Sequence, residues 1–241
     1  MPLDIEQVAD AFVEVADTLV ADFDLIEFLH SFAGHAAAIS GGAAAGVMLS
    51  GQDGALHHVG GSSGDARLLE LLQIQSDEGP CLDSFRTGEP VVVPDLAAVE
   101  DRWPALVPRA LSMGLHAVYA FPMRHRERVI GGLNVFHSHH EGMVPQGARV
   151  LQALADLATI ALIQEQAVTR AEMVTEQLQV ALDSRIVVEQ AKGAVARSLD
   201  VSVDEAFELL RSHARNGRRR LTDVAHDVVT APDGPDLLRR R

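Results

Sequence analysis

The residues of this chain that are best suited to bind a polyanion lie near its C-terminus. The single lysine, Lys192, stands in a segment of helical composition, and the other nineteen basic residues are all arginine. Codon bias toward arginine explains why lysine is rare, but it does not explain why the exception falls here. The arginines close to it in sequence are Arg185, Arg197, Arg211, Arg215, Arg218, Arg219 and Arg220. This density of cations predicts a surface that binds a phosphate backbone; the simpler alternative is an ordinary solvated face.

Gly193 follows the lysine inside the same helical segment. A glycine in a helix interior costs about 1 kcal/mol relative to alanine, so the missing side chain is expected to serve a purpose. A second helix crossing at short distance and the close approach of a ligand backbone explain it equally well. Arg185 and Lys192 are seven residues apart, and Arg211 and Arg215 are four apart, so each pair shares a helical face.

The sequence shows no arrangement that predicts catalysis. It contains no nucleophile placed beside a base and no pair of carboxylates spaced for acid–base chemistry. The glycine-rich segment 41–46 lacks the Lys-Ser/Thr pair of a P-loop and precedes a predicted strand, whereas a phosphate-binding loop would follow one. We therefore predict that the protein is not an enzyme.

Histidines and the single cysteine are the remaining candidates for metal or cofactor chemistry. His137 and His139, at the end of a predicted strand, would point to the same face, as a metal pair does, and His57 and His58 add two more ring nitrogens. No carboxylate or cysteine stands at matching spacing, so we predict no metal site. Cys81 is an anchor for a tetrapyrrole, a redox sensor or, as most free cysteines are, buried and inert.

The cysteine content and the apolar pattern also indicate the compartment. One cysteine excludes an intrachain disulfide and favours a reducing environment. Residues 1–6 lack the basic and apolar regions of a signal peptide, and no uninterrupted apolar run reaches the roughly 20 residues that span a bilayer. We expect a cytoplasmic protein that does not enter the membrane.

Charge divides the chain into two parts. Residues 1–168 hold 8 arginines against 22 acidic residues, a net of −14, whereas residues 169–241 hold 12 basic and 12 acidic residues, a net of zero. The whole-chain pI of about 5.1 therefore describes the front part only. An acidic front domain is a poor partner for nucleic acid, so any such partner is expected at the rear.

The front part mixes helices and strands without strict alternation. Helical spacing of apolar residues predicts helices over 5–20 and 25–39. Short apolar runs bounded by Gly, Pro, Asp and Ser predict strands over 45–49, 56–59, 91–93, 118–122 and 129–136, and helical composition predicts helices over 66–75 and 104–113. This pattern favours an α+β domain over a doubly wound one.

The rear part is predicted to be entirely helical. A helix runs from Pro145 to about Ser198, and a capping box at 202–205 and an Asn-Gly stop at 216–217 bound a second helix, with a third before Pro232. Apolar residues near a coiled-coil seam are Leu157, Ala161, Val168, Ala171, Leu178 and Leu182. A dimeric coiled coil is favoured over a lone amphipathic linker, although Gln164 and Thr175 interrupt the seam.

These rear motifs together resemble an ANTAR domain, the RNA-binding module of transcription antiterminators. The resemblance covers about 50 residues and is carried by Gln190-Ala-Lys-Gly193, Asp204-Glu-Ala-Phe207, Leu210-Arg211, Ala214-Arg215 and Arg220-Leu-Thr-Asp-Val-Ala225. It implies a three-helix bundle that binds stem-loops of a nascent leader transcript. The RNA contacts that it implies are Arg185, Gln190, Ala191, Lys192, Gly193, Arg211, Ala214, Arg215, Arg219 and Arg220. Ala191 and Gly193 would let the RNA or a neighbouring helix approach closely.

The front part resembles a GAF domain over roughly residues 20–165. The motifs are Asp77-Glu-Gly-Pro-Cys-Leu-Asp83, Thr87-Gly-Glu-Pro90, Pro94-Asp-Leu96, Arg102-Trp-Pro104, Phe121-Pro122 and Gly131-Gly-Leu133. The resemblance implies an antiparallel sheet with flanking helices around a pocket, for which Cys81, Trp103 and Phe121 are the candidate lining residues. It does not identify a cofactor or a ligand, because GAF domains bind many small molecules or none.

We accordingly expect four segments: a GAF sensor with its N-terminal helices (1–165), a helical coiled-coil linker that overlaps its last helix (146–182), an all-α ANTAR bundle (183–230) and a disordered tail (231–241). The expected function is antitermination by a homodimer that binds structured RNA, with a possible small-molecule ligand in the sensor. The alternative is a small-molecule sensor whose C-terminal bundle docks a protein partner.

Overall fold

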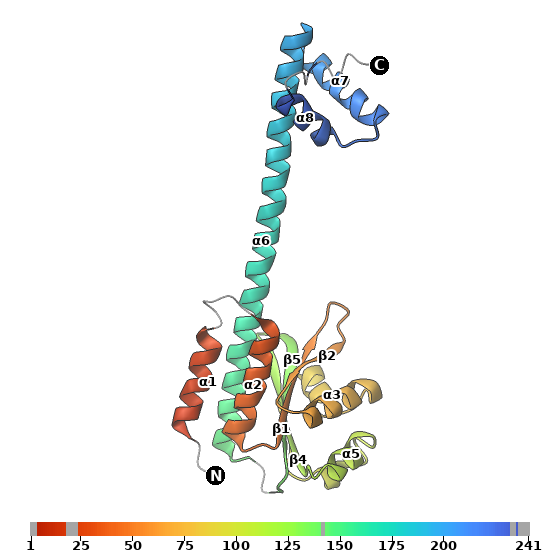
Figure 1. Ribbon diagram of the computed structural model, residues 1–241. Helices are drawn as coiled ribbons and strands as arrows, with labels where there is room; N and C mark the ends of the chain where they lie inside the picture. The colour runs from red at the N-terminus through yellow and green to blue at the C-terminus, as the bar shows by residue number, and fades with distance from the viewer. Residues whose placement is uncertain (1–3, 18–23, 141–142, 232–234, 236–241) are drawn as a thin grey trace. The chain divides into compact units, whose positions relative to one another are not determined.

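The computed structural model describes residues 4–17, 24–140, 143–231 and 235 (Figure 1). The chain divides into two compact units, Met1–Ala167 and Val168–Arg241. One long helix, α6 (Pro145–Leu199), begins in the first unit and ends in the second. The predicted tail falls almost wholly outside the described residues. In the part of the chain that is described, no helix is both long and apolar enough to cross a membrane.

The first unit is built on a five-stranded antiparallel sheet with the strand order β2-β1-β5-β4-β3. The strands are β1 (Ala44–Ser50), β2 (Leu56–Gly61), β3 (Val91–Val93), β4 (Ala117–His125) and β5 (Arg128–His137). In β5, the central strand, Leu133 and Val135 point to one face of the sheet and Asn134 and Phe136 to the other, as the alternation of strand side chains requires. All five predicted strands are confirmed.

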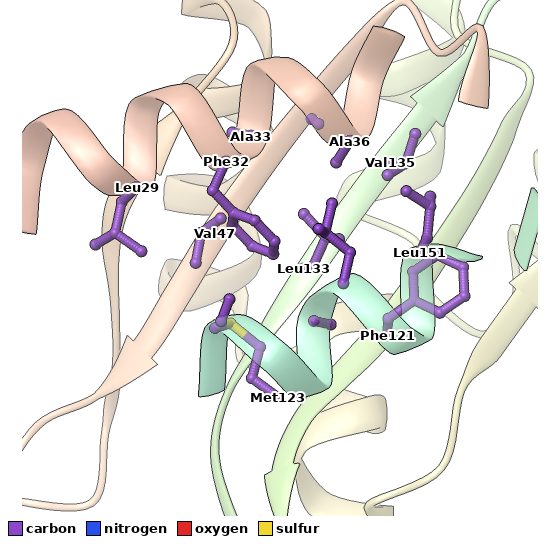
Figure 2. Packing of buried hydrophobic residues seen from close by; sticks show 14 of the residues in the cluster. Leu29, Phe32, Ala33, Ala36, Val47, Phe121, Met123, Leu133, Val135 and Leu151 are labelled. Carbon is purple, nitrogen blue, oxygen red and sulfur yellow. The ribbon is translucent and has the colours of Figure 1, made fainter. Parts of the chain in front are cut away.

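One face of the sheet is covered by α1 (Ile5–Asp17), α2 (Leu25–Ser40) and the first part of α6 (Figure 1). Helix α2 begins where the Asp24 carboxylate accepts the N–H groups of Ile26 and Glu27, and it ends where Gly41 adopts a left-handed conformation. Figure 2 shows the apolar core on this face, which includes Leu29, Phe32, Ala33, Ala36, Val47, Phe121, Met123, Leu133, Val135 and Leu151.

The other face is covered by α3 (Gly64–Ser76), α4 (Pro80–Thr87), α5 (Leu106–Ser112) and a 3₁₀ turn at Leu96–Val99. Helix α4 was not predicted, because its eight residues are too short to show a clear apolar period. Its signal lay in the flanking residues: Pro80 occupies the first turn and Gly88 ends the helix in a left-handed conformation. The helix carries Cys81 onto the sheet.

The second unit packs the end of α6 against α7 (Val203–Asn216) and α8 (Leu221–Thr230). Its core consists of Ala191, Val195, Ala206, Leu210, Ala214, Val224, Ala225 and Val228. The predicted capping box is confirmed, because the Ser202 hydroxyl accepts the Glu205 N–H while the Glu205 carboxylate accepts the Ser202 N–H. The antiparallel α+β domain and the three-helix bundle are therefore both as the sequence predicts.

The end of α7 differs in one detail from the prediction. Gly217 closes the helix, but it keeps a right-handed conformation, and Arg218 adopts the left-handed one with φ of 52°. A left-handed conformation costs a non-glycine residue about 1 kcal/mol or more. The chain thus holds an arginine where a glycine would be less strained.

Candidate nucleic-acid interface

One exposed face of α6 combines two arginines with an open depression. Arg185, Glu189, Gly193 and Arg197 follow at intervals of four residues and are all exposed. The depression is lined by Glu189, Gln190, Gly193, Ala194, Arg197 and Ser198, all of α6. It arises because Gly193 has no side chain and Ala194 has a short one.

Gly193 is not explained by packing within this chain. A Cβ atom built at this position would meet no heavy atom within 4 Å outside the helix's own nearby backbone. No described part of the chain crosses α6 closely here, so the first of the two explanations for this glycine, a helix crossing, fails for the single chain. The explanation left is the approach of something that the chain does not contain.

Ala191 and Ala214 lie in the core of the second unit rather than on its surface. Ala191 has no exposed area, and Ala214 is 4 % exposed. Neither side chain can reach an RNA placed on the outside of the folded bundle, which corrects their assignment as RNA contacts. Ala191 instead has the other role expected for it, because its small size lets α7 and α8 approach α6.

Lys192 is bound within the bundle. Its ammonium donates to the two carboxylate oxygens of Glu189, at 2.9 and 3.0 Å, and lies 5.4 Å from the centre of the Phe207 ring. The side chain is 16 % exposed. Because Glu189 and Lys192 belong to α6 and Phe207 to α7, this lysine ties the two helices together.

The remaining cations of the second unit separate into paired and unpaired groups. Arg211 pairs with Glu208 at 3.4 Å, and Arg219 pairs with Asp227 at 2.7 Å. Within residues 183–230, the arginines that have no carboxylate within 4.0 Å among the described residues are Arg185 and Arg197 (the α6 arginines) and Arg215, Arg218 and Arg220 (the turn arginines). All five are exposed, so their guanidinium groups are available to an external anion.

Arg197 and Arg218 were missing from the predicted contact set. A signal for Arg197 was present, because it lies four residues after Gly193 and so on the same face of the helix. No local pattern marks Arg218. Its position in a left-handed turn is visible only in the folded chain.

The three residues proposed for a ligand pocket in the first unit are not brought together. Phe121 lies on the sheet face that α2 and α6 cover (Figure 2). Trp103 packs on the other face beside α5, and Cys81 packs under α4 with Met48, Leu56 and Leu82. The three side chains belong to three separate clusters, and each is at most 1 % exposed.

The acidic residues of the predicted GAF motif fasten the segment that carries Trp103. The Glu78 carboxylate accepts the N–H groups of Ala105 and Leu106, at 2.6 and 3.1 Å. The Asp83 carboxylate accepts the indole N–H of Trp103 at 3.1 Å and pairs with Arg102 at 2.8 Å. These contacts give the motif and its tryptophan a structural role.

The histidines considered for a metal pair are placed differently from one another. His137 is buried against the Tyr119 ring, and burial lowers its pKa, whereas His139 is exposed. Within the described ranges, no three His, Cys, Asp or Glu side chains are arranged to hold a metal ion.

Comparison with known proteins assigns both units. A GAF-domain family model matches residues 3–163, and an ANTAR-domain family model matches residues 176–229. Similar solved structures include the GAF domain of a phosphoenolpyruvate-protein phosphotransferase from Coxiella burnetii, with 12% identity, a TM-score of 0.53, and coverage of 69% of this chain and 99% of that chain. The free methionine-R-sulfoxide reductase from Neisseria meningitidis, solved in complex with its substrate, has 17% identity, a TM-score of 0.52, and coverage of 70% and 96%.

A third similar structure is the phycoerythrobilin-bound GAF domain from a cyanobacterial phytochrome, with 15% identity, a TM-score of 0.53, and coverage of 69% and 98%. At these identities the three likenesses concern the fold alone. A search of curated proteins finds no match. GAF domains are sensor modules, and ANTAR domains are RNA-binding antitermination modules. The chain belongs to the GAF-domain family and carries an ANTAR domain after its GAF domain.

Proposed function

We propose that this protein is a cytoplasmic, non-enzymatic antitermination regulator whose ANTAR domain binds tandem stem-loops in a nascent leader mRNA under the control of its GAF sensor. The observation that carries the proposal is the set of five exposed arginines within residues 183–230 that have no ion pair among the described residues. Arginines that stabilise the fold are expected to form ion pairs with carboxylates, as Arg211 and Arg219 do. Unpaired guanidinium groups suit phosphate, which they bind with two parallel hydrogen bonds.

The α6 arginines are proposed to act together with the depression at Gly193. RNA loops present splayed bases and a backbone of irregular shape, and proteins read them through close contacts rather than through a duplex groove. A helix face with no side chain at Gly193 lets a sugar or a base come near the helix backbone, while Arg185 and Arg197 contact phosphates on either side. The Gln190 amide borders the same depression and can hydrogen-bond to a base edge.

Two ANTAR domains are needed for two stem-loops, and the exposed part of α6 offers a way to pair them. Within 168–186 the helix exposes large apolar side chains that a single chain leaves uncovered: Val168, Met173, Val174, Leu178, Val180, Leu182 and Ile186. Val168, Leu178 and Leu182 belong to the predicted coiled-coil seam. A second copy of the same helix covers such a seam in register, so we propose a parallel homodimer.

The experiment is a titration of the full-length protein with a tandem stem-loop leader RNA at several salt concentrations. Arg185→Ala with Arg197→Ala, and separately Arg215→Ala with Arg218→Ala, should each weaken binding. Each pair should also flatten the slope of log affinity against log salt by roughly 1 to 2 units, since each lost phosphate contact removes about 0.7 to 0.9. Arg170→Ala is the matched control, because Arg170 is an exposed α6 arginine before the ANTAR match.

The same titration distinguishes RNA binding from the alternative, in which the C-terminal bundle docks a protein partner. A bundle that docks a protein has no reason to bind RNA in a salt-dependent way. Wild-type protein that ignores tandem stem-loops at low salt, or pair variants that bind with the slope of the Arg170→Ala control, would refute the RNA-binding proposal. Circular dichroism of each variant confirms that the helices are retained.

A further inference from the structure

A cluster of polar side chains is buried at the centre of the GAF sheet, on the face under α3 and α4. Glu70 and Gln73 come from α3, Cys81 and Ser84 from α4, and Asn134 from the central strand β5. None of the five has any exposed area. We call these five residues the polar cluster.

The strands leave room for this cluster where they carry glycine. Asn134 pairs across the sheet with Gly46, and the Glu70 carboxylate occupies the space that a side chain at Gly46 would need. Likewise the Cys81 sulfur lies 2.6 Å from where a Cβ of Gly132 would be. The sheet surface is thus hollowed at two adjacent positions and filled with polar atoms in place of apolar ones.

Hydrogen bonds satisfy the polar cluster only in part. Glu70 is bonded to the His58 ring and accepts from the Asn134 amide at 3.4 Å, and the Gln73 oxygen accepts the Cys81 N–H at 3.0 Å. Three buried atoms have no partner among the described residues: Gln73 Nε2, Ser84 Oγ and Asn134 Oδ1. Buried polar atoms without partners are costly, and apolar residues of the same shape would be more stable, so their presence points to a ligand.

An apolar groove lies next to the polar cluster. It has a volume of about 180 Å³, and its lining residues are Gly54, Ala55, Leu56, Ile74, Asp77, Leu82, Phe85 and Arg86. Leu56 and Leu82 line the groove and also pack with Cys81 in one apolar cluster, so the floor of the groove adjoins the polar cluster. This volume suits a small molecule with a single aromatic ring.

The charges around the polar cluster favour a cationic nitrogen. Burial raises the pKa of Glu70 to about 7, while the His58 contact and the Asn134 amide oppose this rise. His58 is the basic group that contacts the carboxyl, and its side chain is partly exposed. Burial and the neighbouring Glu70 both raise the pKa of Cys81, so the thiol is neutral. None of the five residues of the polar cluster is basic, so a ligand cation can be a second partner of the Glu70 carboxylate beside His58.

We propose that the polar cluster binds the basic nitrogen group of a small molecule whose apolar body lies in the groove between α3, α4 and the β1–β2 turn. The Glu70 carboxylate and Asn134 Oδ1 accept its N–H groups, and Ser84 Oγ and Gln73 Nε2 bind further polar atoms of the ligand. Leu56 and Leu82 must move apart to admit it. This inference rests on the proposed function of the GAF domain as the sensor, and it replaces the pocket of Cys81, Trp103 and Phe121 by one in which Cys81 alone is kept.

The test uses three probes of nearly equal shape: benzamidine, which is cationic, benzamide, which is neutral, and benzoate, which is anionic. Calorimetry on the full-length protein should show benzamidine binding at least tenfold more tightly than the other two. Glu70→Gln should weaken benzamidine at least tenfold, and Ser84→Ala, which removes a hydroxyl that lacks a partner, should weaken it about threefold. Glu127→Gln removes an exposed carboxylate from the β4–β5 turn and should change nothing.

Methyl NMR signals of Leu56 and Leu82 place the probe. Benzamidine that does not bind, that binds Glu70→Gln equally well, or that leaves both leucine signals unshifted overturns the proposal, as does tighter binding of benzoate. The same samples are titrated with leader RNA in the absence of probe. If the wild type binds the leader RNA but does not bind benzamidine, the ligand site alone is refuted. If the wild type does not bind the leader RNA, the proposed function is refuted.

Discussion

Glu70 makes the stability of the GAF domain depend on pH in a direction opposite to that of most carboxylates. Its pKa is raised from 4.5 in the unfolded chain to about 7 in the fold, because burial disfavours the charged form. A raised pKa means that the folded state holds its proton longer than the unfolded state does. The contribution of this group is therefore fully present below pH 4.5 and is lost as the pH rises through about 7.

The size of the effect follows from the shift. A shift of one pKa unit corresponds to about 1.4 kcal/mol, so the folded state loses about 3 kcal/mol from Glu70 between pH 4.5 and pH 8. Glutamine is neutral and of nearly the same shape, and it keeps an oxygen to accept from Asn134. Relative to the wild type, Glu70→Gln should therefore gain about 3 kcal/mol of unfolding free energy over this pH range.

The assay is urea unfolding followed by tryptophan fluorescence. Trp103 is the single tryptophan, it is 1 % exposed, and it lies in the first unit, so its emission reports the unfolding of the GAF domain. Subtracting the wild-type curve from the variant curve cancels the titration of groups that Glu70 does not contact, such as His137. A difference that stays constant from pH 4.5 to pH 8 would show that Glu70 is not buried in the way the structure places it.

Three further variants test the second unit and the linker. Gly193→Ala should stabilise the unit by about 1 kcal/mol, because its Cβ meets nothing, and should weaken RNA binding; stabilisation with unchanged affinity would remove the depression from the interface. Lys192→Ala should lower the free energy of unfolding by about 1 kcal/mol, because the contacts with Glu189 and Phe207 are lost. It should leave the salt slope of RNA binding unchanged. A slope reduced by one unit would instead return Lys192 to the phosphate contacts. Leu178→Glu with Leu182→Glu should convert a dimer into a monomer in sedimentation experiments, and a dimer that persists would place the contact elsewhere.

The sequence predicted elements well where a local pattern decided them. Ser202 and Glu205 predicted the start of α7 because a capping box is complete within four residues. The strands followed from short apolar runs between turn residues. Helix α4 was missed because eight residues complete barely two turns and so show no clear apolar period.

The proposed ligand site of the GAF domain was beyond prediction because it depends on which face of the sheet a residue reaches. Phe121 and Asn134 lie on neighbouring strands, yet they point to opposite faces, and a shift of one residue in either strand would put both side chains on the same face. Glu70 gave no sign of burial in the sequence. It lies in a helix of ordinary composition, and only the glycine across from Asn134 makes room for its carboxyl.

The division between paired and unpaired cations was partly readable from the sequence. Lys192 and Arg211 each have a glutamate three residues earlier, at Glu189 and Glu208, which is the spacing and order that favours an ion pair on a helix. Arg197 and Arg215 have no acidic residue three or four positions before them. The rarity of lysine therefore drew attention to Lys192, a cation whose contacts with Glu189 and Phe207 stabilise the bundle itself. Among the described residues of 183–230, Arg219 is the one arginine without such a neighbour that still has an ion pair, with Asp227. The other arginines without such a neighbour are left free, and free charge of this kind is the better guide to where a polyanion binds.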